Sequence, residues 1–361
     1  MTSVPQGDGL WRPRTPTAAT LLGSCPPKPL ALPRTSAAVA GALRELATAG
    51  RLDLALPGCG DTTSRWSALA AFGRGDLALA RLAEGHTDAV AILAEAGRPA
   101  DPGPVYGVWA ARSGGTGAAL SRDGGRLRLT GTVRFCSGAG TLDRALVAAT
   151  APDGGPDGWL VDVDLADPRV HRDQDTWQAI GMDASDSPDV RFDELPVSSD
   201  MVVGEPGWYV DRRGFVLGSG GVAAVWLGGA AGVLDDVRAM LADAPHVDDH
   251  QLAHLGALCT ALRAADALLT DTARLVDDAA FVQPAIAVRT AKSAVERAAW
   301  DIHDRVPRIT GPTPLCRDRA FAQRLADLEV YVRQHHAERD LAALGRAVLD
   351  TAVLATGEAA R

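Results

Sequence analysis

The sequence predicts an α+β protein with an N-terminal mostly helical domain, a central small β-barrel or β-sandwich domain and a C-terminal four-helix bundle. Three observations support this prediction. The first hundred residues show helical periodicity, the middle of the chain alternates short strands with turns, and the chain from Gly214 onward is almost purely helical. We therefore divide the 361 residues into 1–104, 105–203 and 204–361, a number of units that suits a chain of this length.

The N-terminal unit begins with an irregular lead-in rich in Pro, Thr and Ser, which extends to about Ser36. A helix is expected over 37–49, and the apolar pattern of 64–96 indicates two further helices. We place the break between these two near 73–75, because glycines interrupt the pattern there and Asp76 is a preferred N-cap residue.

The central unit is organised around the segment 126–135, in which apolar and polar side chains alternate. This two-residue period predicts a strand with one buried face. The strand runs into 137–140, four small residues that would let the backbone approach a large flat ligand closely. At this edge Phe135 offers an aromatic face and Ser137 a hydroxyl group. Further strands are expected at 105–110, 144–150, 158–165 and 190–192.

The C-terminal unit is expected to form long helices with short joints, an arrangement typical of an antiparallel bundle. The expected helices are 215–243, 249–278, 284–305 and 319–356. The uncharged run 220–234 is 15 residues long and rich in glycine. A bilayer span needs about 20 residues, so this run indicates a buried helix.

Charge and cysteine usage exclude several classes of protein. A net charge of −9 and a pI of about 5.4 argue against a general nucleic-acid-binding surface. The five cysteines are far apart and include no CxxC pair, which argues against a disulfide framework or a zinc site and fits reduced thiols in the cytoplasm. The first residues show no signal-peptide pattern, so we expect a cytoplasmic protein without a membrane partner.

Several stretches, taken in order, resemble the acyl-CoA dehydrogenase superfamily, a flavoprotein fold shared with flavin-dependent monooxygenases. The stretch 105–115 (VYGVWAARSGG) resembles the first flavin-facing strand and loop, and 128–140 (RLTGTVRFCSGAG) the strand that covers the isoalloxazine ring. The stretches 176–197 and 204–236 resemble the exit from the β domain and the entry into the first bundle helix. The stretch 326–340 (ADLEVYVRQHHAERD) resembles the segment that carries the catalytic residue. The resemblance covers the β domain and bundle well and the N-terminal unit weakly.

The resemblance implies a non-covalently bound FAD wedged between the β domain and the bundle. Carried over residue by residue, Trp109, Ala110 and Ser113 would lie beside the flavin ring or the diphosphate. Phe135 would pack on the ring, and Ser137 would form a hydrogen bond to it. From the residues alone, Phe135 could equally be a core side chain and Ser137 a turn residue.

The catalytic position departs from the family pattern. Family members usually remove the substrate α-proton with a Glu while hydride leaves the β-carbon for the flavin. With Asp327 and Tyr331 kept in register, His335 replaces this Glu, and the other position used by some members, near 218–219, has no carboxylate. The Arg-x-x-Phe-Gly element that helps to hold the FAD of a neighbouring subunit is also missing.

His335 continues an apolar stripe through Leu328 and Val332, with helical spacings of four and three residues. This spacing predicts that His335 faces inward and that Glu338 lies one turn on, close to it. Glu338 could orient the imidazole, raise its basicity or act in its place. A hydrogen-bonded core histidine is the alternative. We expect no metal site, because the adjacent His336 would diverge from His335 on a helix.

Three functions fit these observations. The first is an FAD-dependent, acyl-CoA dehydrogenase-like oxidoreductase that forms an α,β-double bond in an acyl thioester of CoA or acyl-carrier protein, with His335 as the base and an electron-transfer flavoprotein as a possible partner. The second is a two-component monooxygenase that takes reduced flavin from a reductase, with His335 as a hydrogen-bond donor during the reaction with oxygen. The third is a non-catalytic partner subunit. The resemblance also implies a homodimer or homotetramer.

Overall fold

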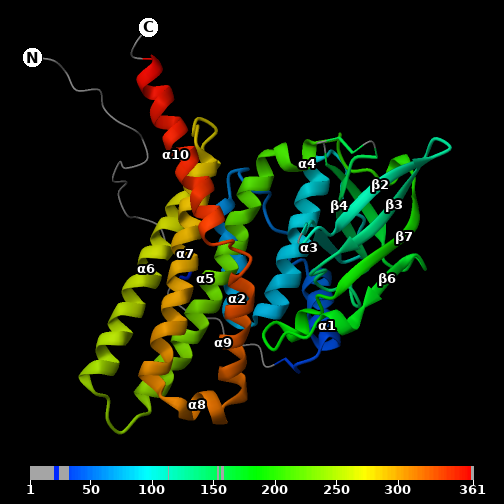
Figure 1. The fold of residues 1–361 in the computed structure, drawn as a ribbon. Helices are drawn as coiled ribbons and strands as arrows, with labels where there is room; N and C mark the ends of the chain where they lie inside the picture. Colours follow the sequence, from blue (N-terminus) through cyan, green and yellow to red (C-terminus); the bar gives the residue numbers. More distant parts are fainter. Residues whose placement is uncertain (1–19, 24–31, 113, 153, 156–157, 359–361) are drawn as a thin grey trace, which may run out of the picture.

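The computed structural model describes residues 20–23, 32–112, 114–152, 154–155 and 158–358. Helices occupy both ends of the described chain, and a sheet occupies its middle (Figure 1). The predicted α+β fold class and the predicted order of helices, sheet and helical bundle are therefore confirmed. Most of the predicted irregular lead-in lies outside the described residues.

The N-terminal region contains the three expected helices, which are α1 (Ser36–Thr48), α2 (Thr62–Gly75) and α3 (Leu77–Glu95). The break between α2 and α3 falls at Asp76, as the sequence predicts. The Asp76 carboxylate accepts a hydrogen bond of 2.8 Å from the backbone N–H of Leu79, which satisfies one of the free donors at the start of α3.

Replacement of Asp76 by alanine is expected to lower the free energy of unfolding by about 1 kcal/mol, since α3 loses its N-cap. Asp76→Asn keeps a capping oxygen and should cost little. Asp61→Ala is a second control, because Asp61 stands at the N-cap of α2 without a side-chain capping bond. Urea denaturation measures all three variants. Equal destabilisation by the three substitutions would show that the cap contributes nothing.

The sheet has seven strands among the described residues, in the order β1-β4-β2-β3-β7-β6, with β5 paired to β4. The strands are β1 (Tyr106–Trp109), β2 (Gly117–Asp123), β3 (Arg126–Val133), β4 (Arg144–Thr150), β5 (Trp159–Asp164), β6 (Val170–Asp173) and β7 (Asp189–Val197). The strands β2 and β6 were not expected. β2 begins with small residues that resemble a loop, and β6 has four residues and is held by its pairing with β7.

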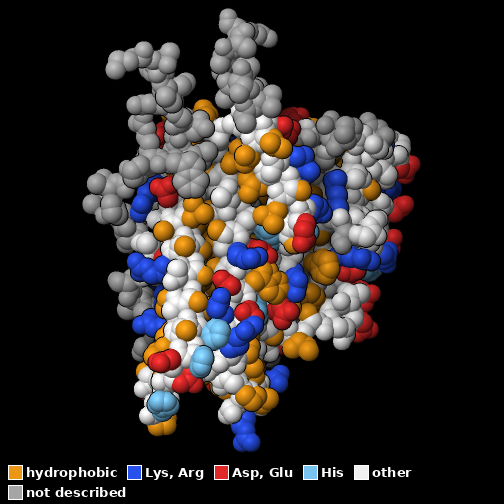
Figure 2. All heavy atoms as spheres, turned by 60° about the vertical axis from the view of Figure 1, so that its left-hand side comes forward, with side chains coloured by type: hydrophobic (Ala, Val, Ile, Leu, Met, Phe, Trp, Pro, Cys, Tyr) orange, Lys and Arg blue, Asp and Glu red, His pale blue; other side chains and the backbone are white. Residues whose placement is uncertain are grey.

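The C-terminal region contains α4 (Trp208–Asp211), α5 (Arg213–Ala242), α6 (Asp249–Asp277), α7 (Pro284–Thr310), α8 (Pro312–Arg317), α9 (Arg319–Val332) and α10 (Glu338–Glu358). The apolar run 220–234 lies in α5, whose most apolar window is 78% buried inside the protein, so the prediction of a buried helix is confirmed. Figure 2 looks onto the helical side of the molecule, where apolar side chains are interspersed with charged ones.

The prediction of one continuous helix over 319–356 is wrong. The helix α9 ends at Val332, and a turn at 333–337 separates it from α10, which projects beyond the other helices (Figure 1). Ala337 in this turn has a φ of 42°, in the left-handed region. That conformation is costly for a residue with a Cβ atom and is maintained by surrounding contacts. The turn decides where His335 lies.

Helix α3 lies between the sheet and the bundle and contributes to the core on both of its sides (Figure 1). Leu79 and Leu82 pack in the core that α3 shares with the sheet, whereas Leu77 and Ala80 belong to the core of the bundle. Side chains on α3 can therefore contact both the sheet edge and the helices α5 and α9. In the candidate site, one side chain of α3 contacts the sheet edge and another contacts α9.

Candidate functional site

The residues expected to contact a flavin ring lie where β1 and β3 end. Trp109 is buried, and its indole Nε1 donates a hydrogen bond of 3.1 Å to the carbonyl of Ser137. Beside it Ala110 is exposed. The Phe135 side chain is 56% exposed and its φ is 60°, so the alternative that Phe135 belongs to the core is wrong. Ser113 lies outside the described residues. Of these residues Phe135 and Ala110 are exposed, whereas Trp109 is buried.

Ser137 faces inward, from a turn that follows β3. Its Oγ accepts hydrogen bonds from Nε of Arg81 (3.1 Å) and from Oγ of Ser187 (3.0 Å). The small residues after it have an internal role that the sequence did not reveal. A Cβ atom on Gly138 would lie 2.6 Å from the Leu142 side chain, and one on Gly140 would lie 2.8 Å from a carboxylate oxygen of Asp186. At these two positions the close approach is to the protein's own side chains.

A buried polar network extends from Ser137 across α3 to α9. Nη1 of Arg81 forms an ion pair of 2.5 Å with Glu84, and the hydroxyl of Tyr331 donates a hydrogen bond of 3.4 Å to Glu84. Burial raises the pKa of Glu84, although the Arg81 guanidinium opposes this. Neither Arg81 nor Glu84 was predicted from the sequence as a site residue. Two opposite charges three residues apart in the otherwise apolar stretch 77–85 were the available signal.

His335 lies in the turn after α9 and is 5% exposed. Its Nε2 lies 3.1 Å from Oγ of Ser293 on α7. The Ser293 hydroxyl donates its proton to the carbonyl of Arg289, at 2.9 Å. With the Ser293 proton directed to this carbonyl, the matching tautomer of His335 carries its hydrogen on Nε2 and donates it to Ser293. Nδ1 is then the nitrogen with the lone pair.

Nδ1 of His335 is buried and has no hydrogen-bond partner among the described residues. Burial also lowers the pKa of His335 below its ordinary value of 6.5, so the ring is neutral at pH 7. A neutral imidazole with a free buried acceptor atom can take a proton from a bound molecule. The prediction of an inward-facing His335 is confirmed, although a turn and not a helix positions it.

Glu338 does not hold the His335 ring. It is exposed at the first position of α10, and no hydrogen bond or ion pair joins it to His335 in the described part of the chain. The expected contact required a continuous helix, which ends earlier. Ser293 positions the ring instead. Within the described residues no cluster of three ligating side chains could hold a metal ion.

Aromatic contacts connect the surroundings of His335 with the buried network. The rings of Trp226 and Tyr331 meet edge to face, with centroids 6.2 Å apart. Nζ of Lys292, the residue before Ser293, lies 5.4 Å from the centroid of the Trp226 ring. The described contacts therefore lead from Ser137 at the sheet edge through α3 and α9 to the neighbourhood of His335. Lys292 was not predicted from the sequence either.

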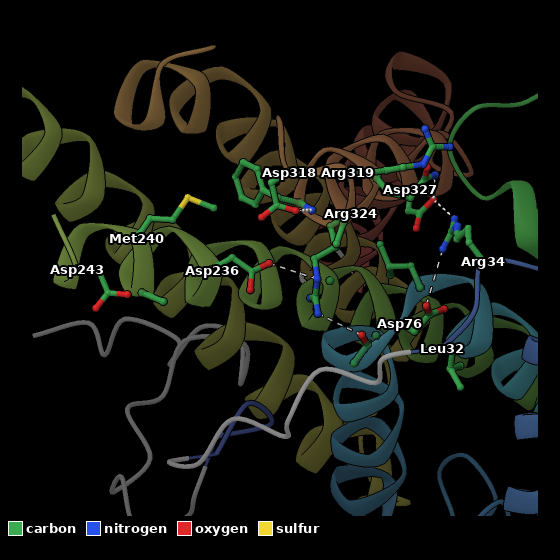
Figure 3. A pocket seen from close by; sticks show the side chains of 18 residues that line it. Leu32, Arg34, Asp76, Asp236, Met240, Asp243, Asp318, Arg319, Arg324 and Asp327 are labelled. Carbon is green, nitrogen blue, oxygen red and sulfur yellow. Dashed lines mark hydrogen bonds and ion pairs between the residues drawn. The ribbon is translucent and has the colours of Figure 1, made fainter. Parts of the chain in front are cut away.

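The large cavity in Figure 3 is separate from this site. Its volume is about 680 Å³, and it is lined by the α2–α3 junction, α5 and the first half of α9. Several of its charges pair with one another, as Arg34 does with Asp327 (2.5 Å) and Arg324 with Asp236 (3.3 Å). None of the residues predicted to contact flavin or substrate lines it. By contrast, the cavity between α3 and Ser137 has only about 10 Å³, so side chains fill that space.

Comparisons of the sequence give no assignment, because no protein-family model and no curated protein matches it. The structure does match solved structures. One is a dibenzothiophene monooxygenase, TdsC, from Paenibacillus, with a TM-score of 0.70 and 18% identity over 88% of this chain and 96% of that one. Another is KijD3, solved with FMN and a dTDP-linked sugar, with a TM-score of 0.74 and 19% identity over 92% of this chain and 96% of that one.

A third match is the methanesulfinate monooxygenase MsuC from Pseudomonas fluorescens, with a TM-score of 0.70 and 19% identity over 89% of this chain and 98% of that one. TdsC has also been solved with bound FMN. These likenesses establish the fold that the sequence resemblance implied. The neighbours include flavin-dependent monooxygenases, and the flavin in the TdsC and KijD3 structures is FMN.

Proposed function

We propose that this chain, whose fold is that of the acyl-CoA dehydrogenase superfamily, is a flavin-dependent monooxygenase that takes reduced flavin from a separate reductase. The single observation that carries the proposal is the buried Nδ1 of His335, which has no hydrogen-bond partner among the described residues, at the position where the superfamily's dehydrogenases usually have a carboxylate. Two of the structural neighbours reported above are monooxygenases by name, which supports this choice.

The exposed ends of β1 and β3 are where the proposal places a flavin ring. The exposed Phe135 ring offers a flat surface at the end of β3, and the exposed Ala110 at the end of β1 adds no bulk. Phe135, Ala110 and the turn at Ser137 would hold the ring. A reduced flavin bound there would supply the two electrons with which dioxygen gives one oxygen atom to the substrate and the other to water. The missing Arg-x-x-Phe-Gly element favours FMN over FAD.

His335 would act as the proton acceptor. Ser293 holds Nε2 as the donor, so Nδ1 stays available to accept a proton from a hydroxyl, amine or activated C–H group of the substrate. Arg81 and Glu84 would fix the turn that carries Ser137, because they connect it to α3 and, through Tyr331, to α9.

A second candidate is the dehydrogenation of an acyl thioester to its α,β-enoyl form. Glu84 favours it, because it is a buried carboxylate whose pKa is raised by burial. It could serve as an alternative base if its contacts with Arg81 and Tyr331 opened. This reaction would pass electrons to an electron-transfer flavoprotein and would consume no oxygen.

One experiment separates the two functions. The purified protein is mixed with FMN, a flavin reductase, NADH and ¹⁸O₂, with indole and dibenzothiophene as substrates. We expect a product that carries one labelled oxygen atom and is absent without protein. Anaerobic bleaching of bound flavin by acyl-CoA, without labelled product, would favour the dehydrogenase. If flavin oxidation yields only hydrogen peroxide with both indole and dibenzothiophene, the result would contradict the monooxygenase proposal.

A further inference from the structure

Lysine is rare in this protein, and Lys292 is the one lysine among the described residues. Only two of the chain's 36 lysine and arginine side chains are lysines, and the other, Lys28, lies outside the described residues. Lys292 lies on α7, directly before the serine that holds His335. The protein thus has a compact ammonium group, and not its usual guanidinium, beside the proposed base.

Lys292 has no partner of opposite charge in the described part of the chain. It is half-buried, and no carboxylate there lies within 4.0 Å of its Nζ. Two carboxylates act on it from a greater distance, and both are engaged elsewhere. Glu84 is paired with Arg81, and Asp340 lies 3.6 Å from Nδ1 of His336.

The ammonium therefore depends on an aromatic face for its electrostatic stabilisation. It lies over the Trp226 ring, a contact that compensates only part of the hydration lost by a buried cation. The pKa of Lys292 is lowered by this burial. Nearby, Nδ1 of His335 and Nε1 of Trp226 are buried without hydrogen-bond partners among the described residues. The Lys292 ammonium and the Trp226 N–H are therefore donors to which no described residue supplies an acceptor.

We propose that Lys292 is the anion-binding residue of this site, and that its ammonium group binds a carboxylate, sulfonate or phosphate group of the bound ligand. The inference rests on the proposed function only in placing a ligand beside His335. The anion could belong to the substrate or be the phosphate of FMN, since both present oxyanions. An anion here gives the ammonium the partner that the protein itself does not supply and orients the ligand towards Nδ1 of His335.

The scarcity of lysine makes a direct test possible. Protein labelled with ¹³Cε-lysine gives two side-chain NMR signals, and Lys28→Arg leaves that of Lys292 alone. The labelled protein is titrated with formate and benzoate, with their neutral counterparts formamide and benzyl alcohol, and with FMN and riboflavin. Lys28 serves as the internal control for non-specific salt effects. The readout is binding, so it does not depend on monooxygenase activity.

We expect at least one of the three anions to shift the Lys292 signal saturably and to raise its pKa by about one unit, a tenfold change in proton affinity. The neutral counterparts should leave it unchanged. A response to formate or benzoate assigns the anion to the substrate, and a response to FMN alone, but not riboflavin, assigns it to the cofactor phosphate. The proposal is overturned if no anion moves Lys292 more than Lys28, or if neutral counterparts move it equally. Loss of oxygenation with an intact anion response would contradict the proposed function alone.

Discussion

Replacement of His335 by glutamine is expected to lower kcat by at least about 100-fold, the lower end of what a positioned general base contributes. The glutamine amide can still donate a hydrogen bond to Ser293, so the substitution removes the basic lone pair while keeping the contact to α7. Turnover is measured with the labelled-oxygen assay, and circular dichroism reports whether the fold is kept.

His336→Gln is the matched control, because His336 is the next residue and its side chain is 54% exposed. It should retain nearly full turnover. The pH profile provides a second readout. Burial lowers the pKa of His335 below 6.5, so the basic form prevails above that pH and kcat/KM should fall only on the acid side, below pH 6.5. Full turnover in His335→Gln, or an acid limb that persists unchanged in it, would remove His335 from the mechanism.

Replacement of Gly228 by alanine is expected to destabilise the fold by about 3 kcal/mol, at the upper end of ordinary overpacking. A Cβ atom at Gly228 would lie 1.9 Å from the carbonyl oxygen of Ala70 on α2. The obstacle is backbone, so α2 and α5 would have to separate. Gly73 shows the same contact from the other helix, with its Cβ position 2.2 Å from the carbonyl oxygen of Val225.

Gly256→Ala is the control for this substitution. Gly256 lies within α6, and a Cβ atom there would meet nothing within 4 Å. Alanine should stabilise the helix by up to about 1 kcal/mol, because it loses less backbone entropy on folding than glycine. The two substitutions should therefore have opposite signs in urea denaturation. Equal stability of Gly228→Ala and the unaltered protein would contradict the close packing of α2 against α5.

Local chemistry explains which parts of the fold could be predicted. The break at Asp76 was predicted because the capping residue and the glycines before it act within one helical turn. The end of α9 was missed because apolar spacing continues through Val332 to His335 and no proline or glycine marks the turn at Ala337. There the tertiary contact between His335 and α7 overrides the local pattern.

In the candidate site, too, local sequence patterns could be predicted and contacts between distant residues could not. The positions of Trp109 and Phe135 at the sheet edge followed from the strand pattern and the resemblance, and their role as flavin contacts stays a prediction. The contacts of Arg81 with Ser137 and of Tyr331 with Glu84 could not be predicted, because they join residues 56 and 247 positions apart. Only the fold brings these side chains together.

The central claim is that the edge carrying Phe135 binds a flavin ring, and anaerobic equilibrium dialysis with FMN tests it most directly. The measurement uses oxidised and reduced FMN with the unaltered protein and with Phe135→Ala. We predict saturable binding of at least one redox form, weakened about tenfold in Phe135→Ala, which corresponds to about 1.4 kcal/mol of lost stacking and burial. Absence of binding in both redox states, or equal binding by the two proteins, would contradict the account.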